Sequence, residues 1–465
     1  EWAATDQVTL RSILASRRDE TWRPGDFDSL PTVDVDVSNW DRNQQDSTEL
    51  QAIFTTGRWS GVAGLFLLDA SAVSRVEILL GTTGMVIGRP GLNNLLVSNA
   101  DTRNWAVFTD LGYAISDHWS ASLGGRFTHD ERSVDILRQI LVGGLSPFYG
   151  GSGIVASTPS DFAGSATFEK FTPRATLQWQ PQDHQNVYIS YSEGFRGGGF
   201  DPRGLTTLAP DFNGDGQVSE AEVYEFMKFE PEDVASFEVG WKATLFDGRM
   251  SSRLAVFSAD YTDVQIPGSV AVDNDGDGIA EQYVGITTNA ADAGIDGLEW
   301  EALAIVAEDL GVPGARLELS WAVGLIDPDF NEFIDESGND VADERGFDNT
   351  PGWTFAAAVN YAIPVAWFGR AGELALIPTI AALDEQIQFS EPDPLIDQSS
   401  YAVWDLSAVW SGLDDHWQIG LHGKNLTDKA YKVSGLNIPL GLEGNVTAYY
   451  GNPRQIWLDL QYRFN

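Results

Sequence analysis

The feature that most constrains the fold is an alternation of apolar and polar residues with a period of two. At the C-terminal end, Ile456, Leu458, Leu460 and Tyr462 are apolar, whereas the residues between them are mostly polar. Successive side chains of a β-strand point to opposite faces, so this alternation predicts a strand with one apolar and one polar face. The pattern recurs along the whole chain and predicts an all-β protein.

We expect about 16 strands. They fall at residues 6–20, 46–56, 59–70, 102–114, 118–131, 166–179, 185–197, 233–246, 249–264, 281–306, 315–326, 352–362, 371–388, 400–411, 416–430 and 453–464. The tenth span is longer than a usual strand, which predicts a bulge or bend at Ala291–Gly294.

The connections between these strands alternate in length. Short ones fall at 55–58, 116–118, 180–183, 247–248, 364–369 and 413–415, and long ones at 21–45, 71–101, 132–165, 198–232, 265–280, 327–350 and 431–452. Outer-membrane β-barrels have short periplasmic turns and long outer loops. Tryptophan and tyrosine near the strand ends would form the interfacial girdles of such a barrel. The pattern predicts a transmembrane antiparallel β-barrel, and closure would pair every backbone group in lipid.

Composition excludes several other classes of protein. The chain holds no stretch of 18 apolar residues, so no transmembrane helix is expected. The absence of cysteine removes disulfides, thiolate nucleophiles and Cys-based metal sites. The formal net charge, 28 − 68 = −40, makes nucleic acid an unfavourable partner because phosphates would be repelled. The same acidity suits either divalent cations or simple solubility.

Five stretches resemble the barrel portion of TonB-dependent outer-membrane receptors, with the iron-complex receptors as the most similar branch. They read LGGRFTHDE (123–131), FTPRATLQW (171–179), VYISYSEGFRGGGF (187–200), GKNLTDKAY (423–431) and GNPRQIWLDLQYRF (451–464), in the family's order. The resemblance implies one barrel domain over residues 1–465, located in the bacterial outer membrane. Its partners would be membrane lipid or lipopolysaccharide and a scarce ligand such as a ferric siderophore.

Two departures from the family follow from the same comparison. The family's barrel has 22 strands, whereas we expect about 16, so Glu1 is interpreted as the opening of the seventh strand. The family's N-terminal plug and TonB-binding segment are not seen, so contact with TonB is expected only through that absent region. The family favours a terminal aromatic residue, and here Phe464 is followed by Asn465.

One local motif predicts a calcium site. Its candidate ligands are Asp211, Asn213, Asp215, Gln217, Ser219 and Glu222, with Gly216 at the sixth of twelve positions. This spacing fits the EF-hand loop, in which oxygen atoms surround one ion. The alternative is an acidic, turn-rich loop without an ion.

A second run shares the first half of that motif. Asp273, Asp275 and Asp277 have the right spacing, and Val284 occupies the twelfth position, so Glu281 would have to substitute. Both runs fall in successive long loops, so calcium would stiffen the outer loops.

Four cations are expected at inward-facing strand positions: Arg174, Arg196, Lys242 and Lys424. The resemblance implies that they would meet plug carboxylates or the passing ligand. No catalytic motif is present, and the five histidines are scattered, so we expect no enzyme and no organic cofactor.

The favoured interpretation is a receptor and transporter barrel for TonB-dependent uptake. Two alternatives stay open at this point. A complete 16-stranded diffusion porin would explain the strand number. A secreted calcium-binding β protein or adhesin would explain the acidity and the two calcium motifs.

Overall fold

The computed structural model describes residues 1–26, 31–33, 35–144, 153–272, 282–335, 339–367, 369–414, 416–438 and 445–464. It contains one antiparallel sheet of 17 strands. Apart from the two-residue β1 (Trp2–Ala3), these are β2 (Val8–Asp26), β3 (Asp36–Thr56), β4 (Trp59–Leu79), β5 (Asn93–Ala114), β6 (Trp119–Val142), β7 (Ile154–Gln182), β8 (Gln185–Arg196), β11 (Glu232–Leu245), β12 (Met250–Val272), β13 (Gln282–Glu308), β14 (Arg316–Phe333), β15 (Trp353–Pro364), β16 (Gly372–Leu383), β17 (Tyr401–Gly412), β18 (Trp417–Lys424) and β21 (Gln455–Tyr462).

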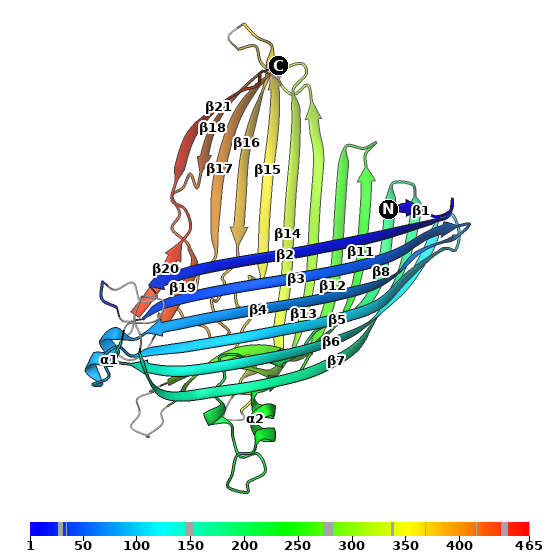
Figure 1. Cartoon of the computed structure of the whole chain (residues 1–465). Coiled ribbons are helices and arrows are strands. Elements are labelled where there is room, and N and C mark those ends of the chain that lie inside the picture. Colours follow the sequence, from blue (N-terminus) through cyan, green and yellow to red (C-terminus); the bar gives the residue numbers. More distant parts are fainter. Residues whose placement is uncertain are drawn as a thin grey trace.

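The long strands follow each other in chain order, and each pairs with the next one. Figure 1 shows that the sheet curves strongly, so that β2–β7 pass across the front of the strands from β11 onward. The strand registers give no pairing of β21 with β2 in the described part of the chain, so β21 forms one edge of the sheet, and β2, with the short β1 paired to its first residues, forms the other.

The prediction of about 16 strands is confirmed. Every predicted strand has a counterpart, and the short turns lie at the predicted places, such as the one between Thr56 and Trp59. The predicted bulge is also confirmed, because the pairing of β13 with β14 shifts register between Asp292 and Ala293.

Three predicted long loops are wrong. Most residues of 21–45, 71–101 and 132–165 continue the strands, and the pairing of β2 with β3 reaches Asp26 and Asp36. Nearer the short turns one face of these strands is apolar, but in the extensions the same face carries polar residues. The apolar alternation therefore ends while the backbone ladder continues. Alternation marks burial in lipid, whereas the ladder needs only a partner strand.

Smaller elements lie in the connections. Two hairpins pair β9 (Gly199–Phe200) with β10 (Lys228–Phe229) and β19 (Lys432–Ile438) with β20 (Asn445–Tyr450). The helical elements are α1 (Gly81–Val86), η2 (Thr206–Leu208), α2 (Glu220–Met227) and η3 (Ala342–Glu344). No helix among the described residues has the length and apolar character needed to cross a membrane.

One face of the sheet is an exposed apolar band. On β4 it runs through alternate residues from Trp59 to Leu67, and the next residue on that face is Asp69. This span of nine residues is within the length of about 9–11 residues that a tilted strand needs to cross a bilayer. Leu123 on β6 is 66% exposed and Leu458 on β21 is 71% exposed. Leucines this exposed over a whole sheet face mark a surface for lipid.

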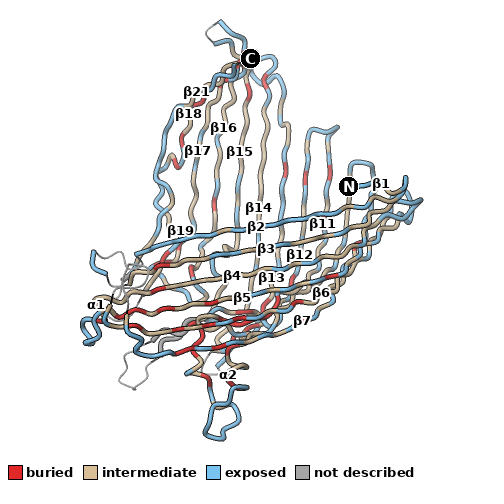
Figure 2. The backbone as a smooth tube through the Cα atoms, in the orientation of Figure 1, coloured by how far each residue is buried: buried red, intermediate tan, exposed pale blue. Residues whose placement is uncertain are grey.

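Buried residues concentrate at one end of the sheet. Val134, Ile136, Phe162, Phe200 and Met227 form one apolar cluster, in which the connection between β8 and β11 packs on the extensions of β6 and β7. Figure 2 shows this buried region near α2, whereas most of the sheet is of intermediate burial or exposed.

Candidate ligand passage on the polar face

The face opposite the apolar band is polar, and we call it the polar face. On β11 it carries Ser236, Glu238 and Lys242, between the apolar Phe237, Val239 and Trp241 of the other face. The connection between β8 and β11 contacts the sheet from this side.

That connection shows that the polar face is concave. Arg138 of β6 donates a 2.7 Å hydrogen bond to the carbonyl oxygen of Arg203, and Thr287 of β13 donates one of 2.8 Å to Asp201. Asp201 and Arg203 are neighbours in the connection, so a short segment reaches two strands that are far apart in the sheet. Such a span is possible only across the inside of the curve.

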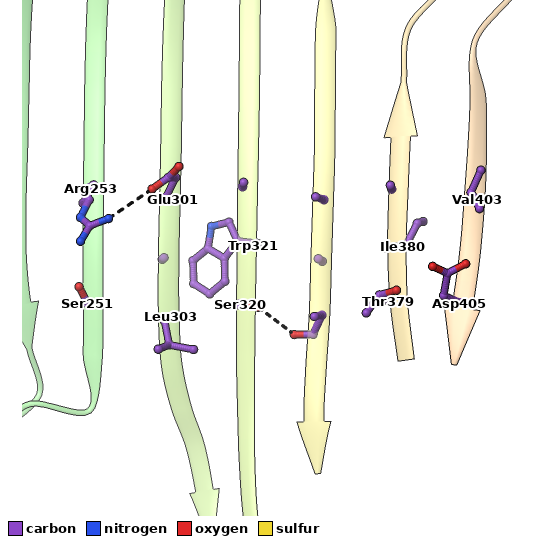
Figure 3. A pocket seen from close by; sticks show the side chains of 16 residues that line it. Ser251, Arg253, Glu301, Leu303, Ser320, Trp321, Thr379, Ile380, Val403 and Asp405 are labelled. Atoms are coloured by element: carbon purple, nitrogen blue, oxygen red, sulfur yellow. Dashed lines mark hydrogen bonds and ion pairs between the residues drawn. The ribbon is translucent and has the colours of Figure 1, made fainter. Parts of the chain in front are cut away.

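The first groove on this face crosses β12–β17 and has a volume of about 620 Å³. We call it the alanine groove, after Ala322, Ala356, Ala358 and Ala381. Figure 3 shows Arg253 and Glu301 at one end of it, joined by an ion pair of 3.6 Å, and Thr379 and Asp405 at the other end. Its only arginine is therefore already paired with a carboxylate.

The second groove lies at the turn end of β2–β7 and has a volume of about 870 Å³. We call it the arginine groove, after Arg11, Arg58 and Arg174. Asp110 also lines it, together with several serine, threonine and glutamine side chains. Lining of this kind offers hydrogen-bond donors and positive charge to a solute.

Two further cations lie over aromatic rings of the polar face. The guanidinium carbon of Arg126 is 5.2 Å from the ring centroid of Phe66 and 5.8 Å from that of Phe108. The Lys242 ammonium is 5.2 Å from the ring centroid of Tyr188. Cation–π contact holds each charge in place at the wall, and the Arg126 Nε also donates a 3.1 Å hydrogen bond to Thr128 Oγ1.

The four predicted cations all take polar-face positions by register, but they do not form one cluster. Arg174 lies opposite Ser192, Lys242 opposite Asn186, Arg196 opposite Glu232, and Lys424 opposite Gln455. The four cations belong to β7, β11, β8 and β18, respectively. The structure brings Arg174 together with Arg11 and Arg58, which the sequence reasoning missed. Only the pairing of β2, β4 and β7 through the intervening strands could have revealed that grouping.

A histidine links three strands of the polar face. His422 Nδ1 is 2.9 Å from Ser407 Oγ, and its Nε2 is 2.6 Å from Asp459 Oδ1. Trp457 stacks on the imidazole with ring centroids 5.0 Å apart. This arrangement fastens β21 to β17 and β18.

A buried ion pair holds the connection between β8 and β11 in place. Asp201 is only 4% exposed and lies 2.7 Å from the Arg203 guanidinium. Burial opposes ionisation, but hydrogen bonds and the charge of Arg203, with a further hydrogen bond from Thr287, hold the pKa of the Asp201 carboxyl below its ordinary value. The hydrogen bond to Asp201 in turn raises the pKa of Arg203.

The predicted calcium loop follows in the same connection. Asp211 accepts hydrogen bonds from the backbone N–H groups of Gly214 and Gly216, each 2.7 Å long. Glu222 lies in the first turn of α2 and forms a capping box with Ser219. Hydrogen bonds from the Ser219 backbone and side chain, and from the Asn213 backbone, lower the pKa of Glu222.

No group of three or more His, Cys, Asp or Glu side chains among the described residues is arranged to hold a metal. The first calcium site therefore stays a prediction. Asp273, Asp275, Asp277 and Glu281 of the second run lie outside the described residues.

Comparison with known proteins agrees with this architecture. A family model described as TonB dependent receptor-like, beta-barrel, matches residues 1–426. The chain is similar to the ferric yersiniabactin uptake receptor FyuA from Yersinia pestis, at 19% identity and a TM-score of 0.71, over 99% of this chain and 60% of that one. It is also similar to the siderophore receptor PiuA from Acinetobacter baumannii, at 14% identity and a TM-score of 0.62, over 99% and 62%.

A third similar structure is the copper transporter OprC, at 13% identity and a TM-score of 0.64, over 99% of this chain and 64% of that one. At these identities the likeness shows the fold alone. The chain spans about three fifths of the length of these solved structures.

A curved antiparallel sheet with one lipid-compatible face and one polar face defines a membrane β-barrel protein. The chain belongs to the TonB-dependent receptor β-barrel family. This family consists of outer-membrane transport receptors and not of enzymes. The comparisons lend no support to the porin or to the secreted adhesin.

Proposed function

We propose that this chain forms the wall of an outer-membrane receptor for TonB-dependent uptake of a scarce metal complex. The observation that carries the proposal is a sheet with one apolar and one polar face, in a chain that belongs to a family of transport receptors. Grooves and cations held over aromatic rings lie on the concave, polar face of this sheet. A wall of this kind separates a ligand from lipid and offers it polar contacts along the way.

A ferric siderophore is the ligand class we favour. Two of the similar structures are receptors for ferric yersiniabactin and for a siderophore, and this supports iron over the copper of the third. Siderophores commonly carry anionic oxygen donors, and the partly free arginines of the polar face suit such groups.

The experiment is uptake of radioactive iron by the native bacterium under iron limitation, supplied as its own siderophore. Deletion of the gene should abolish uptake, and the native gene in trans should restore it. Collapse of the inner-membrane proton gradient should abolish uptake as well. A deletion strain that takes up iron normally but loses uptake of copper would replace iron by copper. Unchanged uptake of both metals would refute the proposal.

Calcium binding by the loop of Asp211 and Glu222 is a second, separate proposal, supported by the ligand spacing. Calorimetric titration of the purified protein with Ca²⁺ should show uptake that Glu222→Gln weakens, because the twelfth position supplies a bidentate carboxylate. Glu225→Gln, on the same helix but outside the motif, is the matched control. Absence of Ca²⁺ uptake by the native protein would contradict this proposal.

A further inference from the structure

A groove crosses the apolar face of the sheet on β11–β14, on the side opposite the polar passage. Its volume is about 490 Å³, and Phe237 of β11 and Leu325 of β14 stand at its two sides. Ser258 lies opposite Phe237 in the register, so a small side chain follows a large one. Val256 and Leu298 add apolar lining between the two sides. Because this face meets lipid, an alkyl chain is the occupant that its surroundings supply.

Two carboxylates lie at one end of this groove. Asp296 of β13 and Asp327 of β14 line it and are directly opposite each other in the register. The next positions along the same face carry Asp260 and Asp329, which flank Gly294. Like charges directly opposite each other on neighbouring strands destabilise a sheet. The four carboxylates therefore repel one another unless a cation lies among them.

This chain does not supply that cation. None of the four carboxylates has an ion-pair partner within 4 Å among the described residues, and the rest of the chain contains no lysine, arginine or histidine. The ion pairs of β12–β14 in the described range are Arg253–Glu301 and Arg316–Glu318, and both use residues of the polar face.

The carboxylates lie where the apolar band ends. On β14 this band runs through alternate residues from Leu317 to Leu325, and the next residue on that face is Asp327. The run covers nine residues, within the length of about 9–11 that a tilted strand needs to cross a bilayer. Asp327 lies at the end away from the short turn between β13 and β14. Short turns of outer-membrane barrels are periplasmic, so Asp296 and Asp327 are at the level of the outer-leaflet headgroups.

A second opposed pair at the same level has partners within the chain. Asp46 of β3 lies opposite Asp69 of β4, and Asp69 follows Leu67 at the end of the apolar band. Arg103 of β5 lies 3.6 Å from Asp69, and Gln44 donates a 3.2 Å hydrogen bond to Asp46. An external cation at that pair would meet the charge of Arg103, whereas one at Asp296 and Asp327 would not.

We propose that the groove on β11–β14 seats the alkyl chain of an outer-leaflet lipid whose headgroup carries an ammonium group. An ammonium has three N–H donors and no acceptor, so one group can donate to Asp296 and Asp327 together, because directly opposite residues have Cα atoms about 5 Å apart. The chain of the lipid then lies between Phe237 and Leu325. The inference concerns the lipid-facing surface and does not rest on the proposed uptake.

An ammonium fits these carboxylates better than a divalent metal does. Calcium takes six to eight oxygen ligands, and no group of three or more His, Cys, Asp or Glu side chains in the described part of the chain is arranged to hold a metal. An ammonium needs only hydrogen-bond acceptors within reach of its N–H groups.

The experiment uses the native protein purified from outer membranes in detergent, with native mass spectrometry to measure the bound probe. The probes are octadecylamine and octadecanol, which have the same alkyl chain and differ in the headgroup. The native protein should bind octadecylamine about tenfold or more tighter than octadecanol, as expected for charge-assisted hydrogen bonds. The double variant Asp296→Asn, Asp327→Asn should bind the two probes equally.

The matched control is the double variant Asp46→Asn, Asp69→Asn. It removes the same charge from the same level of the sheet and should keep the preference for octadecylamine. Leu298→Trp fills the groove and should weaken the binding of both probes by the same factor. Each variant is first checked for native fold by heat-modifiable electrophoretic mobility.

Equal binding of the two probes by the native protein would overturn the proposal. So would an unchanged preference in the Asp296→Asn, Asp327→Asn variant, or an equal loss of preference in the control variant. Tighter binding of octadecanoate with Mg²⁺ than of octadecylamine would overturn it in favour of a divalent cation that joins these carboxylates to an anionic lipid.

Discussion

At the scale of single residues, the Asp201–Arg203 pair is held by contacts to two strands that are far apart in the sheet. It connects the β8–β11 connection to β6 through Arg138 and to β13 through Thr287. Because Asp201 is buried, its charge is tolerable only while these partners remain. The pair therefore couples the position of the connection to the ionisation of one carboxyl group.

A pH dependence follows, with a defined sign. The folded-state pKa of Asp201 is lowered, so its contribution to stability is present above the ordinary Asp pKa of 3.8 and is lost as pH falls through the folded value. Hydrogen-exchange protection of the backbone around residues 201–206, corrected for the intrinsic rate, should fall as the pH is lowered below about 4. Asp201→Asn should reduce protection at neutral pH and remove the acid transition. An identical acid transition in that variant would assign it to another group.

For individual site residues, strand alternation predicted which face of the sheet the side chain lies on, and nothing more. Arg174, Arg196, Lys242 and Lys424 could be assigned to a face because a period of two decides orientation. Their neighbours could not be assigned, because Arg11 and Arg58 reach Arg174 only through the pairing of six strands. The Asp201 network depends on a connection that crosses the concave face, and no local sequence pattern encodes that path.

At the scale of elements, glycines in the strands accommodate large rings on neighbouring strands. A Cβ at Gly240 of β11 would lie 2.2 Å from Cζ of Tyr188 on β8, and one at Gly297 of β13 would lie 2.3 Å from Cζ of Phe257 on β12. Tyr188 also donates a 2.5 Å hydrogen bond to Glu238. The Tyr188 ring thus covers Gly240, and the Lys242 ammonium lies 5.2 Å from the centroid of the same ring.

Gly240→Ala should therefore destabilise the sheet, by about 1–3 kcal/mol, because the ring must move and its hydrogen bond to Glu238 is strained. Gly268→Ala on β12 is the matched control, since its added Cβ has only an ordinary contact of 3.5 Å with the carbonyl oxygen of Ile286. The measurement is the temperature at which heat-modifiable mobility is lost. Equal temperatures for the two variants would show that Tyr188 is not held over Gly240.

The positions of the strands were largely predictable from the sequence. Their ends far from the short turns, where long loops were expected, were not. The turn ends agree with prediction to within a few residues, because aromatic residues and turn formers coincide there, as at Trp59 and Trp119. β6 was expected to end at residue 131 and continues to Val142. Beyond the apolar band both faces meet water or the β8–β11 connection, so alternation no longer reports the strand.

At the scale of the whole molecule, the sheet separates lipid from a polar passage. Its apolar face carries exposed leucine, valine and aromatic side chains from β2 to β21. The grooves on its concave face include the arginine groove on β2–β7 and the alanine groove on β12–β17.

The measurement that tests this account most directly is a nitroxide scan along β11. The chain contains no cysteine, so each single-cysteine variant from Ser236 to Ala243 carries one label. In outer-membrane preparations, labels replacing Phe237, Val239, Trp241 and Ala243 should collide often with dissolved oxygen, which concentrates in lipid. Labels replacing Ser236, Glu238, Gly240 and Lys242 should collide rarely with it. A profile without a period of two, or one with the two sets exchanged, would contradict a membrane-spanning sheet whose polar face lines the passage.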